Sequence, residues 1–250
     1  MSDLHWTAIA VDMMEGRWRY NGDAIRFSSA GVLLDGQHRL RACVEAGLPF
    51  ETDVVFGLDP TVMDTIDIGR VRRASDLVSL KGVENATVAC AAATLLLIHD
   101  KFGLHRVQNP DAHPTKTEVI AYVVNNPRLP AVAGRVGNWT KRLVAPRIAV
   151  ACYYLFSAQN QELADRFFKD FAQGVNLART SPAYYLRERM VEDRTSKRKL
   201  QILEILALFC KAWIAYRDGV RMKLLRWAPG NNETFPDISV GGGAAQGGLG

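Results

Sequence analysis

The chain has 250 residues, of which 48% are hydrophobic and 23% are charged, which is the composition of a globular protein with a sizeable core. Its longest apolar runs, residues 88–98 and 202–210, are too short to span a bilayer. No leader-like segment begins the chain, so we expect a cytoplasmic protein without a membrane partner. The net charge of +5 favours polyanionic partners, including DNA.

The first 60 residues combine helix and strand patterns. A helix is predicted up to about Met14, and strand-like segments follow at residues 24–28, 32–34 and 53–56. Turn residues separate the first two strands, which predicts a hairpin. After Gly36 the period changes to 3.6, which predicts a helix ended by Gly47. We expect its buried face to consist of Leu40, Cys43, Val44 and Leu48.

From about residue 75 onward, almost every segment has helical periodicity and no strand is predicted. The expected helices cover residues 76–80, 86–100, 115–124, 131–143, 147–158, 161–173, 183–191 and 196–217. The cysteines are widely spaced among apolar residues, which predicts reduced and buried thiols at Cys43, Cys90, Cys152 and Cys210.

The order of these patterns predicts an α+β protein in three parts. Residues 1–80 form a small mixed α/β head, and residues 81–238 form an all-α helical body. Residues 239–250 form a Gly-rich tail that we expect to be disordered, because it has too few apolar groups to pack.

The densest group of functional side chains lies where a predicted strand gives way to a helix, at Asp35, Gly36, Gln37, His38 and Arg39. Glycine there permits close backbone approach to a ligand, and the first N–H groups and the dipole of the helix favour an anion. Histidine and arginine add donors for phosphate, and the aspartate is a candidate general base. The alternative is an ordinary strand-to-helix turn capped by the aspartate.

This segment resembles the ParB/sulfiredoxin superfamily, in which a strand leads into a Gly-x-[His/Arg]-Arg loop at the start of a helix. The chain has Gly36-Gln37-His38-Arg39, followed by Ala42 and Gly47, and the resemblance covers roughly residues 16–82. It implies a nucleotide-binding head whose cofactor is CTP or ATP, with or without Mg²⁺. The Asp-Gly-Gln-His-Arg form is similar to phage-type members, which implies a bacterial or phage-infected cell. Gln37 stands where sulfiredoxin has its catalytic cysteine, so sulfiredoxin chemistry is not expected.

A second polar segment follows the last predicted strand, at residues 67–73. In the resembled family this region completes the nucleotide pocket, which implies phosphate contacts by Asp67 and Arg70. Arg72 and Arg73 are candidates for contacts with a nucleic-acid backbone, although a solvated linker would have the same composition. No cysteine pair has the spacing of a zinc site. No second acidic residue has an obvious position to share a metal with Asp35, although Asp67 could serve once the chain is folded.

Basic residues also gather in the helical body, at Lys197, Arg198 and Lys199, near a predicted helix–turn–helix junction. They are candidate nucleic-acid contacts, but neighbouring acidic residues also suit a solvated helix face.

Three hypotheses about function remain open from the sequence. The first is a nucleotide- or phosphate-binding, ParB-like protein that acts on or with DNA in phage or mobile-element DNA processing. A homo-oligomer is compatible with this hypothesis. The second is a ParB-fold phosphotransferase or nuclease, in which Asp35 is the general base and His38 a second catalytic residue. The third is a binding module with a degenerate pocket. Asp35 separates the first two, because in a binding clamp a carboxylate beside phosphate repels the ligand unless a metal bridges them, whereas a phosphotransferase needs a carboxylate.

Overall fold

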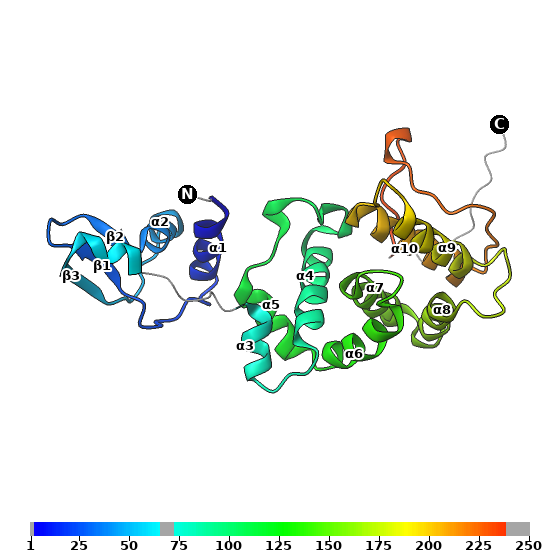
Figure 1. Ribbon diagram of the computed structural model, residues 1–250, viewed down its shortest axis with the longest axis horizontal. Coiled ribbons are helices and arrows are strands. Elements are labelled where there is room, and N and C mark those ends of the chain that lie inside the picture. The colour runs from blue at the N-terminus through cyan, green and yellow to red at the C-terminus, as the bar shows by residue number, and fades with distance from the viewer. Residues whose placement is uncertain (1–2, 66–72, 239–250) are drawn as a thin grey trace.

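The computed structural model describes residues 3–65 and 73–238 and contains a mixed α+β protein, mostly helical, with one small sheet (Figure 1). The predicted tail at residues 239–250 lies outside the described residues. No helix in the described ranges is long and apolar enough to cross a membrane.

The sheet consists of β1 (Ile25–Ser28), β2 (Leu33–Asp35) and β3 (Val54–Leu58), in the order β2-β1-β3. The predicted hairpin is confirmed, because β1 pairs with β2 in antiparallel register, with Arg26 opposite Asp35. The third strand runs parallel to β1, so the chain must cross over between them. Helix α2 (Gln37–Ala46) lies in this crossover and starts directly after β2.

A small apolar cluster joins α2 to helix α1 (Asp3–Met14). The predicted buried face of α2 is wrong at two positions, since Val44 and Leu48 are 77% and 41% exposed. The side of the helix that carries Ala42 is buried instead, against Ala10 and Met13 of α1. The methyl side chain of Ala42 lets α1 and α2 approach closely. Helix α1 is the helix that α2 contacts most.

The body is built from the remaining helices. They are α3 (Ala74–Leu80), α4 (Ala86–Phe102), α5 (Lys116–Asn125), α6 (Arg128–Thr140), α7 (Pro146–Gln159), α8 (Gln161–Gln173), α9 (Pro182–Thr195) and α10 (Ile202–Arg217). Their core is aromatic at its centre, where Phe156 stacks on Trp213 with ring centroids 4.8 Å apart. Helix α3 packs against α4 and α5. Cys90, Cys152 and Cys210 are buried free thiols as predicted, whereas Cys43 is only half-buried.

The last predicted helix begins later than expected, at Ile202 rather than residue 196. Two side chains end α9 and hold the loop of residues 196–201. The Lys199 ammonium donates to the carbonyls of Asp193 and Arg194 at 2.7 and 2.8 Å, and the Asp193 carboxylate accepts the Leu200 N–H at 2.7 Å. The predicted helix at residues 131–143 likewise shifts, to Arg128–Thr140, which leaves residues 141–145 as a loop.

A polar joint connects α1 to the body. Asp12 accepts hydrogen bonds from the Arg17 guanidinium at 2.9 Å and from the Thr115 hydroxyl at 3.0 Å. Thr115 and Glu118 form the capping box at the start of α5, and Glu118 also pairs with Lys101 of α4. The head is therefore anchored to the body through buried, hydrogen-bonded charges, which are costly to leave unpaired.

Glu118 makes this joint sensitive to acid. Burial by itself raises the pKa of its carboxyl, but hydrogen bonds from Lys101 and the Thr115 N–H, together with the charges of Lys101 and Arg17, outweigh burial and hold the pKa below 4.5. A lowered pKa in the folded state stabilises the fold above pH 4.5, and this contribution disappears as the pH falls through the folded-state pKa.

We therefore expect Glu118→Gln to lower the free energy of unfolding by about 2 kcal/mol at pH 7. The difference from the wild type should shrink as the pH is lowered towards 3, as measured by denaturant unfolding at a series of pH values. Glu162→Gln is the matched control, because that carboxylate is 79% exposed and pairs with Arg166 on the surface. A constant difference between wild type and Glu118→Gln over the whole pH range would contradict the prediction.

Candidate functional site: the loop between β2 and α2

The loop predicted as an anion site has the expected strand–loop–helix geometry. Strand β2 ends at Asp35, Gly36 follows with φ +102°, and α2 begins at Gln37. No side chain caps the start of α2, and its first turn contains no acidic residue. The N-cap residue Gly36 therefore supplies no side-chain acceptor for the start of the helix, which is an arrangement that favours an anion.

Gly36 is required for a reason other than the close approach of a ligand. A Cβ atom at this position would lie 2.3 Å from Cδ1 of Ile25 and 3.3 Å from its Cγ2. Ile25 is only 2% exposed, so its side chain has little room to move away. The glycine thus allows the loop to pass over the central strand of the sheet.

Asp35 lies between two arginines. Its Oδ2 atom forms an ion pair with Arg26 on the neighbouring strand and lies 3.4 Å from Nη2 of Arg39, and its Oδ1 atom accepts the Gly36 N–H at 2.7 Å. Two cations and one carboxylate leave the cluster with a net positive charge. The charge that would repel a phosphate is therefore compensated by the protein itself.

Arg39 binds the backbone of its own chain. Its guanidinium donates to the carbonyls of Asp23 and Ala24, the latter at 2.8 Å, and its side chain is only 11% exposed. This arrangement ties the start of α2 to the start of β1. The sequence predicted a phosphate ligand here, whereas in the structure the guanidinium is already occupied by two carbonyls and a carboxylate.

The other polar side chains of the loop also lie partly buried. The Gln37 amide donates to the Leu34 carbonyl at 3.3 Å, and the His38 ring is half-buried. Both belong to the first turn of α2, so they lie beside its uncapped N–H groups.

Three predicted site residues, Asp67, Arg70 and Arg72, lie outside the described residues. Arg73 precedes α3, and its N–H donates to Asp76 at 2.9 Å. The predicted cluster of Lys197, Arg198 and Lys199 lies in the loop between α9 and α10, in the helical body and away from the sheet (Figure 1). The structure therefore separates the two regions that the sequence singled out.

Arg26 is the residue of this site that sequence reasoning missed. The signal was present, because pairing the two predicted strands of the hairpin places Arg26 opposite Asp35. In the described part of the chain, no group of three histidine, cysteine or acidic side chains is close enough to hold a metal ion.

Comparison of the chain with protein-family models, curated proteins and solved structures gave no match.

Proposed function

We propose that the chain is a phosphate- or nucleotide-binding protein of the ParB-like type that acts on or with DNA, and that the anion binds at the start of α2. The observation that carries this proposal is the uncapped N-terminus of α2 beside a net positive cluster of Arg26, Asp35 and Arg39. The ligand is held by backbone N–H groups and by Gln37 and His38, while Arg39 shapes the loop. CTP and ATP are the nucleotides implied by the resemblance.

The alternative is a phosphotransferase or nuclease with Asp35 as general base. Both oxygens of this carboxylate already accept hydrogen bonds or face guanidinium groups. A base must reach the proton that it removes. The geometry of Asp35 therefore favours binding over catalysis.

Gln37→Glu provides a direct test, because it adds a negative charge at the proposed site while keeping the size of the side chain. A carboxylate in the first turn stabilises a helix through its dipole, so the fold should be kept. We expect the affinity for CTP or ATP to fall at least about tenfold, which corresponds to roughly 1.4 kcal/mol of repulsion. Isothermal titration calorimetry with and without Mg²⁺ measures the affinity, and thermal unfolding reports the fold.

Val44→Glu is the matched control, because it makes the same change of charge on an exposed position of the same helix. It should leave the affinity within about twofold of the wild type, since exposed charges two turns apart are well screened. If neither nucleotide nor inorganic phosphate binds the wild type, the proposal is wrong. Turnover of nucleotide by the wild type that is lost in Asp35→Asn would favour the enzyme alternative instead.

A further inference from the structure

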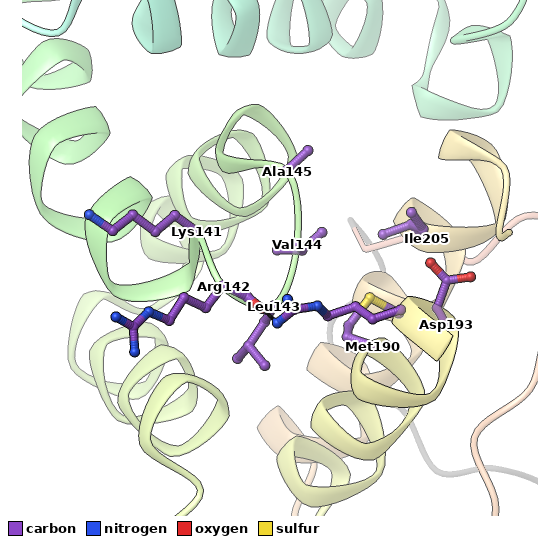
Figure 2. A pocket seen from close by; sticks show the side chains of 9 residues that line it. Lys141, Arg142, Leu143, Val144, Ala145, Met190, Asp193 and Ile205 are labelled. Atoms are coloured by element: carbon purple, nitrogen blue, oxygen red, sulfur yellow. Dashed lines mark hydrogen bonds between the residues drawn. The ribbon is translucent and has the colours of Figure 1, made fainter. Parts of the chain in front are cut away.

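Two loops that are about 50 residues apart in the sequence meet in the helical body. The α6–α7 loop and the end of α9 line a pocket of about 270 Å³, together with Met190 and Ile205 (Figure 2). The Arg194 guanidinium donates to the Arg142 carbonyl and so ties the two loops to each other. We call residues 141–147 and 194–199 together the basic double loop.

The basic double loop contains all of the excess positive charge of the protein. Its two segments, KRLVAPR and RTSKRK, hold seven cations and no acidic residue. The whole chain has a net charge of +5, so the remainder is acidic by two charges. Only the fold brings the two segments together, which is why the sequence singled out the residues at Lys197, Arg198 and Lys199 but not those at 141–147.

Neighbouring acidic groups reduce the positive charge of this surface but are too few to cancel it. Asp193, which lines the pocket, is engaged by the Leu200 N–H, and Glu192 pairs with Arg189 at 2.7 Å. Three cations of the basic double loop have structural partners: Arg194 and Lys199 bind carbonyls, and Arg198 pairs with Glu204. The other four are exposed and form no ion pair with a carboxylate in the described part of the chain. They are Lys141, Arg142, Arg147 and Lys197.

The directions of the Lys141 and Arg142 side chains indicate a polymer rather than a small anion. In Figure 2, the side chains of Lys141 and Arg142 extend away from Met190 and Asp193, and their charged ends lie apart from each other instead of converging on one point. Converging donors enclose a single phosphate, whereas diverging donors contact separate phosphates along a backbone. The spread of the available cations therefore suits a repeating polyanion.

We propose that the basic double loop binds the phosphodiester backbone of a nucleic acid without reading its sequence, through Lys141, Arg142, Arg147 and Lys197. The proposal deepens the proposed function and rests on it for the choice of nucleic acid over other polyanions. It assigns the nucleic-acid contact to the helical body rather than to the head, and it gives Lys199 a structural role at the end of α9. The nucleotide site and the nucleic-acid surface are then separate.

The test replaces all four available cations of the full-length protein by glutamine. Duplex DNA, duplex RNA and polyglutamate are titrated by fluorescence anisotropy at several salt concentrations. We expect the wild type to bind a nucleic acid with a steep salt dependence. The slope of log K against log salt should fall by about 0.9 for each phosphate that the variant no longer neutralises. Comparison of the DNA and RNA titrations identifies which nucleic acid supplies the backbone.

A control variant with the same change of net charge separates local contacts from a general charge effect. It replaces four exposed cations outside the basic double loop by glutamine: Lys81, Lys116, Lys169 and Arg179. The control should keep the slope of the wild type. An equal decrease of slope in both variants, or tighter binding of polyglutamate than of either nucleic acid, would overturn the inference.

Nucleotide affinity is measured on the same samples, so that the two proposals fail separately. The variant of the basic double loop should bind CTP or ATP as the wild type does, because the head is unchanged. Loss of nucleic-acid binding with nucleotide binding intact supports the inference. Absence of nucleotide binding in every sample counts against the head site alone, provided that the nucleic-acid titrations still distinguish variant from control.

Discussion

Gly36→Ala is expected to destabilise the head by about 3 kcal/mol, since it adds strain and a clash at one position. The backbone of Gly36 has φ +102°, which alanine adopts only with strain, and the new Cβ atom would lie 2.3 Å from Cδ1 of buried Ile25. The hairpin and the start of α2 should separate first. Hydrogen exchange of β1 and α2 amides reports this opening, and denaturant unfolding gives the change in free energy.

Gly31→Ala is the matched control for strain, because Gly31 has φ +78° and no atom within 4 Å of the added Cβ. We expect Gly31→Ala to lower the free energy of unfolding by only about 1 kcal/mol. The double variant Ile25→Val with Gly36→Ala removes the clashing Cδ1 atom and should recover part of the stability. Equal effects of Gly31→Ala and Gly36→Ala would show that the contact with Ile25 has no energetic importance.

Arg39→Ala is expected to cost about 3 kcal/mol, because it removes both hydrogen bonds to the Asp23 and Ala24 carbonyls and one of the two cations beside Asp35. The free energy of unfolding of Arg39→Lys should lie between those of the wild type and Arg39→Ala, because a lysine keeps the charge but cannot reach both carbonyls at once. Limited proteolysis of the head and its unfolding free energy measure the effect.

Arg41→Ala is the control, since Arg41 is an exposed cation of the same helix whose contact is with the Trp6 ring, 5.3 Å from the ring centroid. We expect it to cost less than about 1 kcal/mol. If Arg39→Ala were as stable as the wild type yet failed to bind nucleotide, the arginine would be a ligand-binding residue and the backbone clamp would be unimportant. A loss of binding that accompanies unfolding is the result that the structure predicts.

Local patterns made the β2–α2 loop predictable. Asn21-Gly22 and Ala30-Gly31 mark turns, and the change from period 2 to period 3.6 after Gly36 marks the start of a helix. The direction of the Arg39 side chain could not be predicted, because its acceptors lie 15 and 16 residues earlier and become neighbours only when the sheet forms. The role of Gly36 depends in the same way on Ile25, which lies on the preceding strand.

The face of α2 was predicted wrongly because periodicity identifies an apolar side but not what covers it. Val44 is apolar and correctly spaced, yet the element that packs on α2 is α1, which contacts the Ala42 side. The basic double loop was missed for a related reason. Lys141 and Arg142 lay in a predicted helix, and their proximity to Arg194 is a tertiary contact across 52 residues. Contacts of this length leave no periodic signal in a sequence.

The polar joint has a consequence for how the chain is made. Every element of the sheet, with α1 and α2, is complete once Leu58 has been synthesised, but Thr115 and Glu118 emerge about 60 residues later. At typical rates of translation that interval lasts several seconds, which is long compared with the folding of a small unit. During that time only the small cluster of Ala10, Met13 and Ala42 stabilises the packing of α1 on α2. Thr115 and Glu118, which bind Asp12 and Arg17, have not yet been synthesised.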